Sequence, residues 1–281
     1  PGGSAGTCRT RTIRSRQPLS VLEEVKRLAD SGYKEIVLTG IHIASYGKDL
    51  KTTSLLELLQ DIHTVDGIQR IRLGSLEPNL LGKEFVSVVK DMKKVCRHYH
   101  ISLQSGCDST LKRMNRRYTT AQYREIVEGL RSEIPNAAVT TDIMVGFPGE
   151  TDEEFVLTLC FVEDTAFSRI HVFPYSPRKG TPAASYENQV SSEIKEKRSR
   201  ELIALGSRLE QRFMEGFVGK QVDVLFEEEH PKWEGFYEGY TNEYIRAAVK
   251  GEGKQLEGKL LPVLVEKVGK HGLIGEIGDR H

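Results

Sequence analysis

The segment "TTAQYREIVEGLRSEIPNAAVTTDIMVGF", residues 119–147, decides the fold class. Its first half places apolar residues at helical spacing behind a capping box, in which Thr119 is paired with Gln122. Its second half, residues 137–147, is an apolar, β-branched run that predicts a buried strand. A helix that passes directly into a buried strand is one unit of a parallel βα fold.

The same unit recurs on both sides of this segment. Helical patterns cover residues 20–32, 53–65, 79–95 and 151–165, and strand patterns cover residues 34–40, 69–75, 98–105 and 169–176. Capping boxes are indicated for two of these helices, at Ser20 with Glu23 and at Thr151 with Glu154. Right-handed crossovers between such units build either an open doubly wound sheet or a barrel.

The pattern changes towards the C-terminus. Residues 191–219 predict one long helix, and the segments after it alternate apolar and polar residues between glycine-rich turns. This alternation favours a small antiparallel β-barrel. We therefore expect three segments: an irregular segment at residues 1–16, an α/β core with its trailing helix at 17–216, and a β module at 217–281.

Composition excludes some classes of protein. Hydrophobic residues make up 38% of the 281 residues and charged residues 28%, which is typical of a globular chain. Forty basic residues balance forty acidic ones, so no global field attracts nucleic acid and any such partner requires a local patch. No apolar run has the length of a membrane span. Four scattered cysteines fit a reducing cytoplasm better than a disulfide scaffold.

Polar residues or glycines recur at the carboxyl ends of five predicted strands. They are Thr39, Gly40 and His42; Ser75 and Glu77; Gln104 and Ser105; Thr141 and Asp142; and Tyr175 and Ser176. Ligands bind at this edge of parallel βα folds. The same residues are also common in loops that cap helices, but their recurrence at five ends favours a ligand site.

Two further patterns have more than one interpretation. Glu77 is a candidate ligand-binding carboxylate, but it could equally pair with Arg72 or a neighbouring cation. His98 and His100 alternate on one strand face, which indicates packing or supporting hydrogen bonds more than catalysis.

In order and spacing, several blocks resemble the radical SAM methylthiotransferase family. The blocks are "LTGIHIASYG" (38–47), "RIRLGSLEP" (70–78), "SLQSGCDSTLKRMNRRYT" (102–119), "TTDIMVGFPGETDEEF" (140–155) and "RIHVFPYSPRKGTPA" (169–183). The tail is similar to the TRAM module, a small RNA-binding barrel, through "GYTNEYIRAAV" (239–249). Within these blocks, residues 38–47, 74–78 and 171–183 look most like the branch that modifies threonylcarbamoyladenosine in tRNA.

The resemblance implies a partial (βα) barrel of the radical SAM type followed by a TRAM barrel. It also implies an enzyme that adds a methylthio group to C2 of adenosine 37, next to the tRNA anticodon. The family uses S-adenosylmethionine and [4Fe–4S] clusters, one of them held by Cys-x-x-x-Cys-x-x-Cys, a motif that this sequence lacks. We expect these cysteines and the first barrel strand upstream of Pro1, no metal ligands within the chain, and no activity of the chain alone.

The resemblance also assigns roles to residues. Those expected to bind S-adenosylmethionine or the target base are Thr39, Gly40, Ser75, Glu77, Gln104, Ser105, Arg116, Asp142, Val172 and Phe173. Those expected to bind RNA are Lys112, Arg113, Arg117, Tyr240, Tyr244 and Arg246. The four cations in 112–117 could also be a solvated helix face, and the aromatics of the tail could simply fill a barrel. The expected partners are the tRNA anticodon stem-loop and an electron donor such as a flavodoxin or ferredoxin.

Two other functions stay open because the cluster cysteines are absent. One is a βα-barrel metabolic enzyme that uses the same strand-end site without iron. The other is a non-catalytic RNA-binding remnant that depends on the β module.

Overall fold

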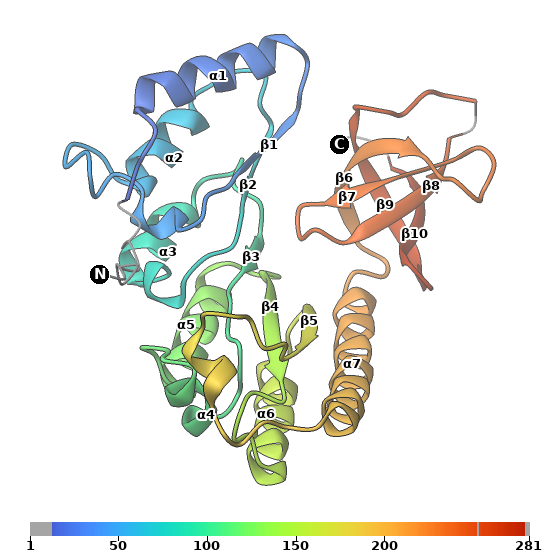
Figure 1. Cartoon of the computed structure of the whole chain (residues 1–281). Helices are drawn as coiled ribbons and strands as arrows, with labels where there is room; N and C mark the ends of the chain where they lie inside the picture. The colour runs from blue at the N-terminus through green and yellow to red at the C-terminus, as the bar shows by residue number, and fades with distance from the viewer. Residues whose placement is uncertain (1–12, 252, 279–281) are drawn as a thin grey trace.

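The computed structural model describes residues 13–251 and 253–278 (Figure 1). Its N-terminal part alternates helices with short strands. In chain order these are α1 (Pro18–Asp30), β1 (Glu35–Leu38), α2 (Leu55–His63), β2 (Arg70–Leu73), α3 (Lys83–Val89), β3 (His98–His100), α4 (Asp108–Arg113), α5 (Thr120–Glu133), β4 (Ala138–Val145), α6 (Asp152–Thr165), β5 (Arg169–Pro174) and α7 (Ser192–Glu215). Three short 3₁₀ helices lie in the loops: η1 (Ile43–Ser45), η2 (Pro78–Leu80) and η3 (Pro182–Ser185).

The five N-terminal strands run parallel and follow one another in chain order. β1 pairs with β2, and β3, β4 and β5 form a three-stranded sheet. Isolated parallel bridges, Ile71 with Val95 and Leu76 with Ile101, join the two sheets. Sequential parallel order is the topology of a (βα) barrel, and a doubly wound sheet would require the strand order to reverse. The partial-barrel prediction is confirmed.

The helices bury one face of these strands. Ile36, Ile71, Tyr99 and Val139 belong to the main core cluster, together with apolar residues of α2, α3, α5 and α6. The long helix α7 covers β5 closely, since a Cβ built on Gly206 would lie 2.4 Å from Cγ1 of Ile170. A side chain at that position of α7 would therefore collide with the sheet.

Capping boxes explain where two helices begin, and a proline explains the start of a third. The predicted boxes at Thr119 and Thr151 are both present. The predicted box at Ser20 with Glu23 is wrong, because α1 already begins at Pro18. Proline is well suited to the first helical position, since it fixes φ and lacks an N–H that would have no partner there.

Two predicted elements are shorter than their patterns. The pattern at 79–95 divides into η2 and α3, and the pattern at 98–105 gives only the three residues of β3. The backbone of Gln104 adopts a left-handed conformation with φ 73°, which interrupts regular pairing after β3. Asp142 was expected at a strand end but lies inside β4, because that strand continues to Val145.

The C-terminal strands close into a barrel. The strands are β6 (Gln221–Glu229), β7 (Phe236–Thr241), β8 (Arg246–Lys250), β9 (Leu260–Gly269) and β10 (Gly272–Ile277), in the order β10-β8-β7-β6-β9. Four of the five pairings are antiparallel, but β10 pairs with β8 in parallel, which the sequence did not indicate. The interior of this barrel is a second apolar cluster that includes Val224, Phe226 and Val249.

The boundaries of the three predicted segments remain a proposal. Residues 1–12 lie outside the described residues, and 13–17 have no regular structure. The boundary at 216/217 falls in the connection between α7, which ends at Glu215, and β6, which begins at Gln221. Among the described residues, no helix is long and apolar enough to span a membrane.

Two helical glycines test the packing of α7 on the sheet. We expect Gly129→Ala in α5 to raise the free energy of unfolding by about 1 kcal/mol, because alanine favours helix and nothing lies within 4 Å of the added Cβ. We expect Gly206→Ala to lower it by about 1–3 kcal/mol through overpacking against Ile170. Urea denaturation measures both, and equal stabilisation by the two substitutions would contradict the close approach.

Candidate functional site: a polar cavity between the sheet and the barrel

The face of the parallel sheet that points away from the helices is polar. On β2, Ile71 and Leu73 join the core, and the alternate residues Arg70 and Arg72 point to the opposite face. This face lines a cavity of about 660 Å³, a volume within the range of small-molecule sites. Its polar lining from the strands comprises Glu35, Arg72, His98, His100, Thr140, Asp142, Arg169 and His171.

A chain of hydrogen-bonding side chains crosses the centre of this face. His100 Nε2 lies 3.2 Å from Oδ2 of Asp142, and its Nδ1 lies 3.0 Å from Oγ1 of Thr140. The same Thr140 oxygen lies 3.1 Å from Nε2 of His98. The hydrogen bond from His100 holds the pKa of Asp142 below its ordinary value of 3.8. Burial lowers the pKa of His98 to about 3, so its imidazole is neutral.

These contacts fix the direction of each hydrogen bond when His100 is neutral. The Asp142 carboxylate accepts from Nε2–H of His100, so Nδ1 of His100 accepts from the Thr140 hydroxyl. The Thr140 oxygen then accepts from Nε2–H of His98. One carboxylate on β4 thus orients two imidazoles on the neighbouring strand β3.

The β-barrel docks on the same face through two buried arginines, each 3% exposed. Arg70 donates to the backbone carbonyls of Tyr240, at 2.8 Å, and Asp223, at 2.5 Å. Arg72 donates to Glu35 from Nε and Nη2, at 2.7 and 3.0 Å, and also reaches the carbonyls of Thr241 and Asn242 at 3.3 Å. The arginines therefore place the hairpin between β7 and β8 at the cavity.

Tyr244 is the aromatic centre of this contact. The Arg72 guanidinium lies 4.5 Å from its ring centroid, and the rings of Tyr240 and His98 lie 4.7 and 5.0 Å away. Its φ of 64° is left-handed, an uncommon conformation for a residue other than glycine. Tyr240, Glu243 and Tyr244 all line the cavity. Burial raises the pKa of the Glu243 carboxyl.

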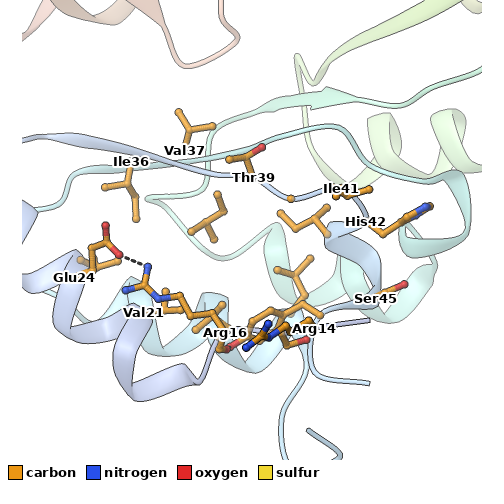
Figure 2. A pocket seen from close by; sticks show the side chains of 18 of the residues that line it. Arg14, Arg16, Val21, Glu24, Ile36, Val37, Thr39, Ile41, His42 and Ser45 are labelled. Atoms are coloured by element: carbon orange, nitrogen blue, oxygen red, sulfur yellow. Dashed lines mark hydrogen bonds and ion pairs between the residues drawn. The ribbon is translucent and has the colours of Figure 1, made fainter. Parts of the chain in front are cut away.

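A second, more apolar cavity of about 870 Å³ lies along β1, between that strand and α1 and α2. Figure 2 shows Ile36, Val37 and Thr39 on the strand side and an ion pair between Arg16 and Glu24 on the helix side. Val37 lines both cavities, so the two adjoin at β1.

Comparison with known proteins identifies the family. The model of the radical SAM superfamily matches residues 6–162, more than half of the chain. The chain belongs to the radical SAM superfamily. It is 40% identical over 260 residues to threonylcarbamoyladenosine tRNA methylthiotransferase MtaB of Bacillus subtilis, an alignment covering 92% of this chain and 57% of that protein. It is 41% identical over 253 residues to tRNA-2-methylthio-N(6)-dimethylallyladenosine synthase of Pelotomaculum thermopropionicum, covering 90% and 56%.

The chain thus spans about half the length of these two relatives. Among solved structures it is similar to coproporphyrinogen III oxidase HemN of Escherichia coli, described as a radical SAM enzyme. The TM-score is 0.53 at 18% identity, covering 72% of this chain and 49% of that one. At this identity the likeness shows the fold alone, and it agrees with the sequential parallel strands.

Radical SAM membership implies S-adenosylmethionine and a [4Fe–4S] cluster as cofactors. The sequence contains no Cys-x-x-x-Cys-x-x-Cys, and in the described ranges no group of three or more potential ligands could hold a metal ion. Cys96 and Cys107 are buried singly, Cys160 is exposed, and burial raises the pKa of Cys96 to about 12. These residues do not fit a cluster, so we derive no chemistry through one.

The residues predicted to bind the cofactor fall into two groups. Ser75 and Asp142 line the polar cavity, whereas Thr39 and Gly40 line the apolar one. The two groups are adjacent, because a Cβ built on Gly74 would lie 3.4 Å from Oγ1 of Thr39. Their proximity supports a common site, but their binding roles stay predictions.

Three other predicted residues are fixed by local contacts. The Glu77 carboxylate contacts Nδ1 of His42 and not Arg72, whose carboxylate partner is Glu35. Ser105 is fully buried, with its hydroxyl 3.4 Å from that of Thr158, so its side chain does not reach the cavity. Gln104 is half-buried, and its left-handed backbone pairs with β4 through Asp142 and Met144.

The remaining cofactor candidates lie away from the centre of the polar face. Phe173 is exposed, and Val172 packs against the core on the other side of β5. Arg116 is exposed after α4 and lines neither cavity. Burial raises the pKa of the Tyr118 hydroxyl, as does the charge of Glu77, whereas the charge of Arg116 opposes this rise.

The residues predicted to bind RNA also fall into two groups, one on the surface after β3 and one in the barrel. Lys112 and Arg117 are exposed, whereas Arg113 is held by Glu154, with a 2.9 Å bond from Nη1. Tyr240 and Tyr244 lie in the contact between the barrel and the sheet, and Arg246 reaches the Tyr240 hydroxyl at 3.4 Å.

Sequence reasoning missed the inward-facing arginines, whereas the supporting hydrogen bonds expected of His98 and His100 are present. The available signal was alternation, since "RIR" at 70–72 and "HYH" at 98–100 each place two polar side chains on one strand face. Alternation gives the face of each residue but not its partner. The partners of Arg70 and Arg72 in the barrel are more than 150 residues away in the sequence.

Arg72 is expected to be critical for stability. Replacing it with glutamine leaves the Glu35 carboxylate without its main partner and removes a donor from the hairpin carbonyls of Thr241 and Asn242. We expect Arg72→Gln to lower the free energy of unfolding by about 3–5 kcal/mol in urea denaturation. The matched control is Arg200→Gln, which removes an exposed ion pair with Glu196 and should cost at most about 0.5 kcal/mol. Equal effects would contradict the docking described.

The Asp142–His100 bond predicts a pH dependence. Because the folded state lowers the pKa of Asp142, its stabilising contribution is present above the ordinary value of 3.8 and is lost as pH falls through the lower, folded-state pKa. The stability difference between wild type and Asp142→Asn should be largest above about pH 5 and shrink in acid. Urea midpoints across pH measure it. His100→Leu is the control, and a pH-dependent difference that persists in that background would contradict this origin.

Proposed function

We propose that the protein containing this chain is a tRNA methylthiotransferase that adds a methylthio group to C2 of N6-threonylcarbamoyladenosine 37. Family membership supports the radical SAM reaction class. Similarity to proteins named as tRNA methylthiotransferases supports the substrate class. The two named relatives modify different adenosines and match about equally well, so identity alone does not choose between the two nucleosides.

The choice of threonylcarbamoyladenosine over dimethylallyladenosine rests on the polarity of the cavity between the sheet and the barrel. A threonylcarbamoyl group is rich in hydrogen-bonding atoms, whereas a dimethylallyl group is apolar. The cavity offers hydroxyl, carboxylate and imidazole groups at Ser75, Asp142 and His171. Leaving such groups against an apolar substituent would cost their hydrogen bonds to water. The blocks at 38–47, 74–78 and 171–183, which look most like the threonylcarbamoyladenosine branch, support the same choice.

S-adenosylmethionine is the proposed cofactor of this site, and when bound it supplies the radical chemistry and the methyl group. Thr39, Gly40, Gln104 and Asp142 are the residues of this chain that we propose to contact it. Asp142 is suited to this role because its carboxylate is oriented by His100 and still partly exposed. The iron–sulfur ligands would come from outside this chain, and the electron donor would be a flavodoxin or ferredoxin in the cytoplasm.

The tRNA anticodon stem-loop is the proposed macromolecular substrate. Lys112 and Arg117 are exposed cations on one short segment after β3 and would contact phosphates. Their contribution would be sequence-independent and would weaken as salt increases. The aromatic residues of the barrel would contribute contacts nearer the target base.

The experiment is nucleoside mass spectrometry of bulk tRNA. The complete gene is expressed in a bacterial strain that lacks its own methylthiotransferases, and digested tRNA is compared with that of the empty-vector strain. We expect threonylcarbamoyladenosine to gain the mass of a methylthio group in place of hydrogen, and dimethylallyladenosine to stay unchanged. Asp142→Asn should reduce the product at least about tenfold, the effect of losing an interaction worth about 1.4 kcal/mol.

The matched control is Asp164→Asn on α6, because that side chain is 60% exposed and pairs with Arg124 away from both cavities. It should leave the product level unchanged. Methylthiolation of dimethylallyladenosine alone would overturn the substrate choice, and the absence of any methylthio product would overturn the function. In the second case, S-adenosylmethionine binding without methylthiolation would favour a metabolic enzyme, and tRNA retention alone would favour an RNA-binding remnant.

A further inference from the structure

The hairpin between β7 and β8 belongs to the β-barrel, but part of its surface lines a cavity of the parallel sheet. Glu243, Tyr244 and Ile245 line the 660 Å³ cavity together with Ser75 and Asp142. In Figure 1 the barrel lies beside β1 and β2, with its β6–β7 side towards them. A ligand in this cavity would therefore contact both modules at once.

The position of the hairpin is determined by several contacts. Arg72 donates to two hairpin carbonyls, and its guanidinium also packs against the Tyr244 ring. The Thr241 hydroxyl accepts from the backbone N–H of Ile245 at 3.2 Å, which closes the turn. The turn is tight enough to hold Tyr244 in a left-handed conformation. Non-glycine residues keep such a conformation only where their surroundings impose it, and they concentrate at ligand sites.

Tyr244 combines this constraint with access to the cavity. Its ring is held by Arg72, Tyr240 and His98, yet the residue is 40% exposed. No described residue forms a hydrogen bond with its hydroxyl. An aromatic ring that is held in place and has a hydroxyl without a hydrogen-bond partner among the described residues can contact a base. The hydroxyl can then form a hydrogen bond with the polar atoms of that base.

We propose that the hairpin of residues 241–245 is the wall that recognises the target base, and that Tyr244 contacts the unpaired adenine of the RNA. Arg72 is then a positioning residue, which acts through Tyr244 without touching the RNA. The inference rests on the proposed function, because it takes RNA as the ligand. It differs from a general RNA-binding role of the barrel in that Tyr244 reads a base inside the cavity.

The test compares two hairpin RNAs of the anticodon type, one with an unpaired adenosine 3′ of the anticodon and one with an abasic site there. Their affinities for the full chain are measured by fluorescence anisotropy at constant salt. Wild type should bind the adenosine hairpin at least about fivefold more tightly, the effect expected of one base–aromatic contact. In Tyr244→Asn this preference should vanish, while affinity for the abasic hairpin stays unchanged. Asparagine is chosen because it tolerates the left-handed backbone.

Tyr186→Asn is the matched control, since Tyr186 is also 40% exposed and lines neither cavity. It should keep the preference. Tyr244→Gly is a second variant that accepts the same φ, and thermal melting confirms that both Tyr244 variants are folded. Arg72→Lys keeps a cation beside Glu35, and it should reduce the preference without abolishing binding.

The outcomes separate this inference from the function on which it rests. A preference that persists in folded Tyr244→Asn or Tyr244→Gly overturns the role of Tyr244 and leaves RNA as the substrate. A wild type that binds the two hairpins equally also overturns it. Failure of wild type to bind either hairpin overturns the proposed RNA substrate together with the inference.

Discussion

The structure depends on two guanidinium groups that are buried on the polar face of a parallel sheet. Arg70 and Arg72 occupy alternate positions of β2, so the same backbone that sends Ile71 into the core sends both charges to the opposite face. Burial of a cation is costly unless its donors find acceptors. Here the acceptors are one carboxylate and four backbone carbonyls, and all four carbonyls belong to the barrel. Satisfying the arginines therefore fixes where the barrel lies.

That placement creates the cavity. Without the hairpin, the inner face of the sheet would be an open polar surface in which His100, Asp142 and His171 are exposed to water. With the hairpin docked, the same groups line a space of nucleoside size with an aromatic residue at its wall. The proposed reaction requires one base to be held in a fixed orientation away from water, and a cavity formed between two modules would serve both requirements.

The sequence allowed the elements to be predicted more fully than the site. Local signals such as the Thr119 and Thr151 boxes depend on residues three positions apart, so they can be read directly from the chain. The Ser20 box failed because Pro18 offered an earlier start to the helix. Ser75 and Asp142 were singled out because polar residues near strand ends are informative in parallel folds, and both line the cavity, although their binding roles stay predictions. Arg72 was considered only as a partner of Glu77, and the partners of His98 and His100 could not be named from the sequence, since these contacts lie in other strands and in the barrel.

The polar cavity between the sheet and the barrel has the volume and the polar lining to hold a nucleoside. The most direct test follows the imidazole groups by ¹H–¹⁵N NMR while N6-threonylcarbamoyladenosine is added to the chain. If the nucleoside binds there, resonances of His100 and His171, which line the cavity, shift progressively, and those of His63 and His271, which do not, stay in place. Shifts confined to His42 beside the apolar cavity, or no shift at saturating nucleoside, would contradict it.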